Sequence, residues 1–163
     1  MLSCHQNQDN ISTKFLLRKP NGQMIDSQTI DGLCSVKAIL NAYKLLINCQ
    51  DKSMILEENP FSITPFGKSI QIIALSPYRS QLVILFADQT AVLLTDSLVE
   101  IESLRLQKTP NEIHWLPDSS GFLYRAIDQL HYHNLTSQAD LFLVSSDFFF
   151  DYRNLNAVWV HIK

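Results

Sequence analysis

His131 and His133 lie two positions apart, a spacing that could hold a metal ion. On a strand, residues i and i+2 point to the same face, and zinc sites use pairs of imidazoles spaced in this way. His114 and His161 fall in or beside neighbouring expected strands and could approach this pair. A zinc site needs three or four convergent ligands, but no Cys, Asp or Glu falls at a ligand-like spacing nearby. The strand pattern places Tyr132 inward, so we expect both histidines on the more exposed face, with no metal and no cofactor.

Asp51, Asp88 and Asp128 are regularly spaced carboxylates, separated by 37 and then 40 positions. Carboxylates could serve acid–base catalysis or bind a metal ion. Each of these three, however, follows an apolar run, occupies a tight turn and precedes a second apolar run. Asp in a turn accepts hydrogen bonds from its own local backbone. We therefore expect each Asp to stabilise its own hairpin turn.

Other catalytic patterns are missing from the sequence. It has no Gly-rich phosphate loop, no Gly-x-Ser-x-Gly elbow and no Cys/His pair in a recognisable local context. We therefore expect a protein that is not an enzyme, and keep a metal-dependent enzyme using His131 and His133 as the weaker alternative.

A cluster of aromatic side chains near the C-terminus is the candidate partner-binding site: Phe148, Phe149, Phe150 and Tyr152. Consecutive aromatics on a strand cannot all face one core, so at least one ring should lie on the opposite face, as on a docking surface. The alternative is a sheet packed on both faces, which would bury all of them.

Composition excludes several classes of protein. With 46% hydrophobic and 18% charged residues, the chain is typical of a folded domain. Its net charge of −3 and the lack of any Lys/Arg-rich window argue against a nucleic-acid partner. Cys4, Cys34 and Cys49 are odd in number with no close pair, so we expect reduced thiols and no disulfide framework. No signal peptide and no apolar run of roughly 20 residues is present, so we expect a cytoplasmic protein without a membrane span.

The positions of turns and apolar runs predict the elements that carry these residues. We expect a flexible lead-in over 1–12 and a single domain over 13–163. Asn21-Gly22 between apolar runs predicts a hairpin. Around Asp88 and Asp128, apolar runs alternate with turns so that each region holds four strands in about 40 residues. A last strand is expected at Ala157–Val160.

Residues 35 to 48 admit two interpretations. Val36, Ile39, Leu40 and Tyr43 begin a helical spacing, which would make the chain a small α+β ligand-binding or adaptor domain with an antiparallel sheet. The segment also occupies the place that β segments take before the later Asp turns. We favour strands for that reason.

The repeated pattern resembles the four-stranded blade of WD-repeat β-propellers. Leu75-Ser76-Pro77-Tyr78 and Trp115-Leu116-Pro117-Asp118 match the Ser-Pro-Asp-Gly-like end of a blade's first strand, and the three turn Asp residues match the family's turn Asp. His133-Asn134-Leu135 and Thr95-Asp96 stand where Trp-Asp would be. The chain departs from the family in lacking an intact Gly-His or Trp-Asp dipeptide at these places.

The resemblance implies an all-β fold, a partial β-propeller of about three four-stranded antiparallel blades plus flanking strands. Propellers typically close with at least four blades, so such a chain would expose a blade face at each end. We therefore expect a scaffold or adaptor for protein–protein interaction, which associates with itself or with a protein partner.

Overall fold

The computed structural model describes residues 2–7, 11–41 and 43–145 of the chain, and all regular structure within them is β. Fifteen strands form four antiparallel sheets in these residues, and no helix is present among them. We number the sheets in chain order. Sheet 1 contains β1 (Leu2–Asn7), β2 (Ser12–Arg18) and β3 (Met24–Asp31). Sheet 2 contains β4 (Cys34–Asn41), β5 (Lys44–Cys49), β6 (Lys52–Glu58) and β7 (Phe61–Lys68).

The remaining two sheets repeat this four-stranded order. Sheet 3 contains β8 (Ile70–Leu75), β9 (Gln81–Phe86), β10 (Ala91–Thr95) and β11 (Glu100–Leu104). Sheet 4 contains β12 (Glu112–Trp115), β13 (Gly121–Ala126), β14 (Gln129–Asn134) and β15 (Asp140–Ser145). In every sheet each strand pairs with the next one along the chain, so the connections within a sheet are hairpins.

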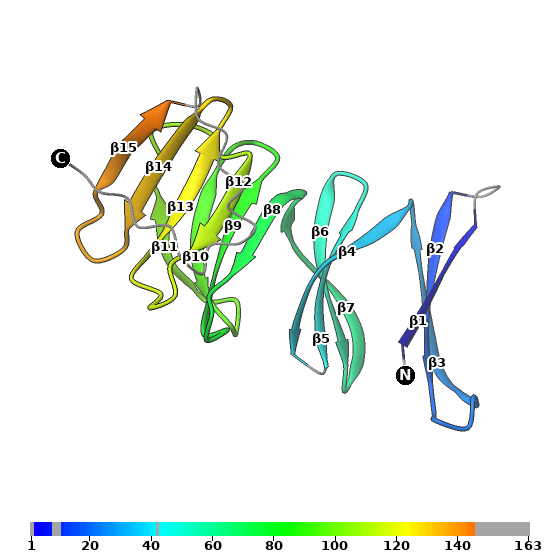
Figure 1. Ribbon diagram of the computed structural model, residues 1–163. Helices are drawn as coiled ribbons and strands as arrows, with labels where there is room; N and C mark the ends of the chain where they lie inside the picture. The colour runs from blue at the N-terminus through cyan, green and yellow to red at the C-terminus, as the bar shows by residue number, and fades with distance from the viewer. Residues whose placement is uncertain (1, 8–10, 42, 146–163) are drawn as a thin grey trace.

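The four sheets follow one another side by side in chain order (Figure 1). The first strand of sheet 3, β8, contacts the first strands of both neighbours, β4 and β12. The last strands of sheets 1 and 2, β3 and β7, also contact each other. Equivalent strands therefore lie next to each other, as in the blades of an incomplete propeller. The expected all-β fold of about three four-stranded sheets with flanking strands is confirmed.

Sheets 3 and 4 are close copies of each other. Arg79 and Ser119, in the first turn of each sheet, have φ of 55° and 59°. Leu98 and Gln138, in the third turn, have φ of 66° and 58°. Both pairs are 40 positions apart in the sequence. A left-handed backbone is uncommon for residues other than Gly, so its recurrence at this interval shows that the two sheets use the same turns.

Residues 35 to 48 form strands β4 and β5, and the helical alternative is wrong. The pairing between these strands shifts between Val36 and Ala38 and again between Ile39 and Asn41. Each shift adds a residue on one strand and moves the following side chains to the other face. These bulges interrupt the two-residue alternation of a regular strand, which explains why the apolar residues of this segment imitate helical spacing.

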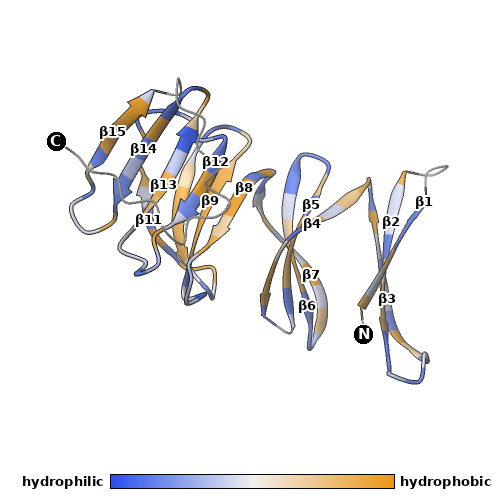
Figure 2. Ribbon diagram, viewed as in Figure 1, coloured by the Kyte–Doolittle hydropathy of each residue, from blue (hydrophilic) through white to orange (hydrophobic). Residues whose placement is uncertain are grey.

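Three apolar cores lie between successive sheets, and β9 contributes to two of them. Leu82 and Ile84 belong to the core between sheets 2 and 3, whereas Val83 and Leu85 belong to the core between sheets 3 and 4. All four side chains are fully buried, each worth about 1.5–3 kcal/mol of transfer free energy. Burial on both faces explains the continuous apolar run of β9, which Figure 2 shows as hydrophobic.

Two features of the N-terminal half differ from what the sequence predicted. Residues 1–12, expected to be a flexible lead-in, include β1, which pairs with β2. The expectation of reduced thiols is wrong for Cys34 and Cys49, which form a disulfide. These cysteines are 15 positions apart in the chain but directly opposite each other on β4 and β5. Hairpin pairing brings together thiols that sequence spacing alone does not connect.

Candidate functional site

His131 and His133 are buried, each with 1% of its surface exposed, so the expectation of a more exposed face is wrong. They share one face of β14, as predicted, but this face packs towards sheet 3. His131 stacks on Tyr124 and His133 stacks on Phe122, with ring centroids 4.8 Å and 5.1 Å apart. Both aromatic rings belong to the core between sheets 3 and 4. Tyr132, expected to point inward, is only half-buried.

Burial lowers the pKa of both imidazoles, against an opposing effect of the nearby Asp140 carboxylate. Within the described part of the chain, no group of three or more His, Cys, Asp or Glu side chains is arranged to hold a metal ion. The two histidines therefore pack as aromatic rings between two sheets.

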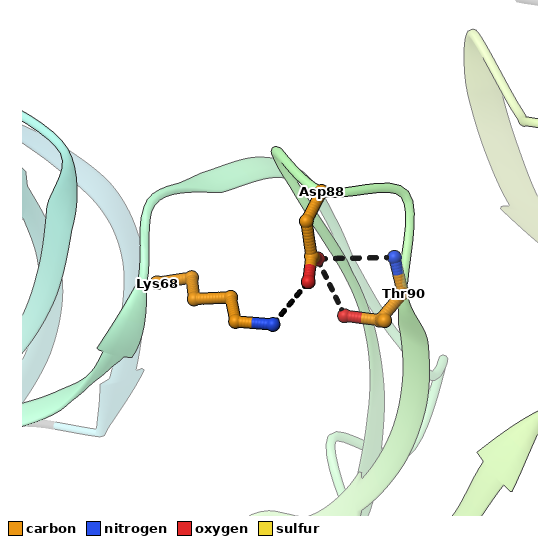
Figure 3. A network of polar contacts seen from close by, with 3 residues as sticks. All are labelled: Lys68, Asp88 and Thr90. Atoms are coloured by element: carbon orange, nitrogen blue, oxygen red, sulfur yellow. Dashed lines mark hydrogen bonds and ion pairs between the residues drawn. The ribbon is translucent and has the colours of Figure 1, made fainter.

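Asp88 stabilises its hairpin turn, as the sequence predicted. Its carboxylate accepts hydrogen bonds from the backbone N–H of Thr90 at 3.2 Å and from the Thr90 hydroxyl at 2.7 Å. It also forms an ion pair with Lys68, the last residue of β7 in the preceding sheet (Figure 3). These contacts lower the pKa of Asp88 to about 2, with the Lys68 bond as the largest cause. The turn Asp thus also links two sheets.

The other turn Asp residues behave differently. The carboxylates of Asp51 and Asp128 make no hydrogen bond or ion pair with the described residues, so the local role predicted for them is absent there. Asp118, in the turn between β12 and β13, takes that role. It accepts bonds from the backbone N–H of Ser120 at 3.0 Å and from the Ser120 hydroxyl at 2.8 Å, and they lower its pKa. The Pro-Asp-Ser-Ser turn signal could have indicated this residue.

The predicted partner-binding residues Phe148, Phe149, Phe150 and Tyr152, and the last expected strand at Ala157–Val160, lie outside the described residues. A different surface at the opposite end of the described chain came from the structure alone. It involves sheet 1, which has three strands in the described ranges where each other sheet has four.

Hydrogen bonds between hairpin turns and the connections from one sheet to the next identify which strand position of sheet 1 no described residue fills. In sheet 2, the connection from β7 to β8 bonds to the turn between β5 and β6, with Ser69 N donating to Asp51 O at 2.9 Å. In sheet 1, the connection from β3 to β4 bonds to the turn between β1 and β2, with Gly32 N donating to Ile11 O at 2.6 Å. The turn between β1 and β2 thus matches a turn between second and third strands.

A buried hydroxyl in each sheet gives the same alignment. Thr13 on β2 donates to the carbonyl of Gly32 at 2.8 Å, and Ser53 on β6 donates to the carbonyl of Lys68 at 2.6 Å. Both side chains are fully buried. Strands β1, β2 and β3 therefore occupy the second, third and fourth positions, and the first position of sheet 1 is unfilled by any described residue. The outer edge of β1 has no strand partner among these residues.

Two apolar side chains on β4 face this unfilled position. Val36 and Ile39 pair across the hairpin with Ile47 and Leu45, which pack in the core between sheets 1 and 2. Val36 and Ile39 therefore lie on the face turned to sheet 1, yet 55% and 59% of their surfaces are exposed.

The equivalent strand of sheet 3 shows what normally covers such residues. On β8, Ile73 and Leu75 face the preceding sheet, pack against its core and are half-buried. That sheet has its first strand in place, because β4 contacts β8. The exposure of Val36 and Ile39 thus follows from the lack of a first strand in sheet 1 among the described residues, rather than from the pattern of β4.

This surface is suited to an extended polypeptide segment. A strand edge presents unpaired backbone N–H and C=O groups that can pair with another strand, and adjacent apolar residues can receive its alternate side chains. The Ser3 hydroxyl on β1 is buried and makes no hydrogen bond with the described residues. The Gln6 amide bonds the carbonyl of Cys34 at 2.8 Å and joins β1 to the start of β4 at one end of the surface. We call the outer edge of β1 together with Val36 and Ile39 the acceptor edge.

One sequence signal could have indicated sheet 1 as a repeat. Asp9 precedes Asp51 by 42 positions, close to the spacing of the other turn Asp residues. Each of the later Asp residues follows the second strand of its sheet. Adding Asp9 to the series would therefore have identified the strand before it as a second strand, with no first strand ahead of it among the described residues.

Comparison of the chain with models of known protein families and with curated proteins gives no match. In the described ranges, no helix is long and apolar enough to cross a membrane.

Proposed function

We propose that this chain is a non-catalytic protein-interaction module that acts as an oligomer or as a subunit of a larger complex. The observation that carries the proposal is the acceptor edge: the outer edge of β1, which has no strand partner among the described residues, beside two exposed apolar residues. In its partnered form, a strand supplied by a second polypeptide or another copy of the chain would complete sheet 1.

The energetic reason for association is local. Burial of Val36 and Ile39 would contribute about 1.5–3 kcal/mol each, before the cost of ordering the incoming segment. Main-chain hydrogen bonds to β1 would add affinity with little dependence on sequence, and the apolar residues would select the facing side chains.

We also propose that the module is a divergent member of the WD-repeat-like propeller class. The 40-residue repetition of turns and the Lys68–Asp88 pair, which joins the end of β7 to the next Asp turn, support this assignment. The lack of intact Gly-His and Trp-Asp dipeptides sets the chain apart from typical members. Location in the cytoplasm stays a prediction.

The proposal is tested by comparing the wild-type chain with the Ile39→Asp variant in light scattering over a range of concentrations. The variant places a charge on an exposed position, so we expect it to fold as the wild type does. The wild-type chain should have the mass of an oligomer or retain a co-purified protein partner, and the variant should lose that association.

Val99→Asp is the matched control. Val99 is also a β-branched apolar residue, with 62% of its surface exposed, but it lies just before β11 in sheet 3, away from the acceptor edge. It should associate as the wild type does. A wild-type chain that stays monomeric without a partner, or an assembly equally weakened by both variants, would contradict the proposal.

A further inference from the structure

The seam between sheets 3 and 4 contains two imidazoles that have few polar partners. Nε2 of His131 lies 3.2 Å from the Gln129 side-chain oxygen. Nδ1 of His131 and both ring nitrogens of His133 are buried and make no hydrogen bond with the described residues. A neutral imidazole stacked on an aromatic ring can occupy such a site. A protonated imidazole carries a charge and two N–H donors, which need acceptors or water.

The charged groups around the pair come from several elements. The charge of Asp140 on β15 acts on both imidazoles, that of Glu102 on β11 acts on His133, and that of Lys108 in the connection to β12 acts on His131. The Tyr124 hydroxyl, on β13, is neutral. Burial favours the neutral form of both histidines and is the largest effect on each, whereas the two carboxylates favour the charged form.

The nearest carboxylate, that of Asp140, is engaged through one oxygen: Oδ2 accepts two hydrogen bonds, whereas the buried Oδ1 accepts none from the described residues. Asp140 accepts hydrogen bonds from the Tyr124 hydroxyl at 2.6 Å and from the backbone N–H of Gln107 at 2.5 Å. Glu102 accepts a bond at 2.5 Å from Gln138. These bonds join β11 and its following connection to sheet 4 at the outer end of the same seam. The unbonded imidazole nitrogens reach neither carboxylate in this arrangement, so pairing an imidazolium with Asp140 or Glu102 requires a movement that disturbs these contacts.

We propose that the contact between sheets 3 and 4 is sensitive to pH and loosens in acid when His131 and His133 are protonated. This inference does not depend on the function proposed above, because it concerns the packing of two sheets far from the acceptor edge along the chain. Protons would thus regulate how firmly sheet 4 is held.

The direction follows from linkage. A histidine whose folded-state pKa is lowered binds fewer protons in the folded than in the unfolded state. The stability that it contributes is complete above the ordinary value of 6.5 and is lost as the pH falls from there towards the lowered folded pKa. Each pH unit through this window would reduce the equilibrium constant for closing the contact between sheets 3 and 4 by up to tenfold for each histidine.

Hydrogen exchange measured at pH 7.5 and 5.5 and corrected for intrinsic rates tests this inference. In the wild type, protection of amides in β10, β11, β13 and β14 should fall by about tenfold or more at the lower pH, while amides in β5 and β6 change less. The double variant His131→Phe/His133→Phe keeps two rings in the seam and should lose the selective pH effect. His5→Gln, an exposed position on β1, should keep it.

NMR titration of the wild-type imidazoles keeps the test informative if the double variant fails to fold. Resonances of His131 and His133 should change over the same pH range in which the seam loses protection. Protonation of both histidines without a change in exchange, or an equal loss of protection in all four sheets, would overturn the inference.

Discussion

At the scale of single residues, turn Asp residues at equivalent places in the repeat contribute differently to stability. Asp88 bonds its own turn and Lys68 of the neighbouring sheet, whereas Asp51 makes neither contact with the described residues. Because Asp88 is solvent-exposed and Lys68 is more than half exposed, salt screens this pair and its contribution is modest.

Asp88→Asn should therefore lower the unfolding midpoint slightly at pH 7. The folded-state pKa of Asp88 is lowered from 3.8 to about 2, so its stabilising effect is present above about pH 4 and is lost as the pH falls towards 2. Denaturant unfolding of wild type and variant should show a difference that narrows over this range. Asp51→Asn is the control and should leave the midpoint unchanged, and equal losses in both variants would contradict the assigned role.

At the scale of elements, close approach between strands limits which residues β13 can carry. Gly121 pairs with Asn134, and a Cβ at Gly121 would overlap the backbone oxygen of His133 and lie 2.9 Å from the Tyr132 ring. A side chain there would force β13 and β14 apart. Gly67, on β7, has no atom closer than 3.8 Å to an added Cβ.

We expect Gly121→Ala to lower the free energy of unfolding by about 1–3 kcal/mol, as overpacking typically does. Gly67→Ala should change it by less than about 0.5 kcal/mol, because the added methyl group only makes ordinary contacts. Urea denaturation of both variants measures the difference. If Gly121→Ala were as stable as Gly67→Ala, the close pairing of β13 with β14 would be refuted.

At the scale of the whole molecule, each core is shared by adjacent sheets only. Phe15 lies in the core between sheets 1 and 2, and Phe122 lies in the core between sheets 3 and 4. Stability in such an arrangement is approximately a sum of sheet terms and nearest-neighbour terms. A cavity in one core should therefore weaken the nearby sheets most.

Phe15→Ala and Phe122→Ala should each cost about 3–5 kcal/mol, because both rings are almost fully buried. In native-state hydrogen exchange, Phe15→Ala should remove protection mainly from β2, β5 and β6, and Phe122→Ala mainly from β9, β10, β13 and β14. The two variants serve as reciprocal controls. Uniform loss of protection by either one would indicate a single cooperative unit instead.

The amino-acid sequence by itself determined the hairpins and their repetition. Asn21-Gly22, the Pro-containing turns and the apolar runs such as Leu82–Leu85 act through local backbone geometry and burial, so they can be recognised without knowledge of the fold. The same local signals explain why the β character of residues 35 to 48 could be inferred from their place in the repeat, even though two bulges disguised the alternation.

Only the tertiary structure decided which surfaces these strands bury or expose. His131 and His133 were expected on an exposed face because nothing in their own strand indicates that sheet 3 covers them. Cys34 and Cys49 meet only because β4 and β5 pair in one register. Val36 and Ile39 are exposed because sheet 1 lacks a first strand among the described residues. In each case the outcome depends on a neighbouring strand or sheet, and that long-range packing leaves no mark in the local sequence pattern.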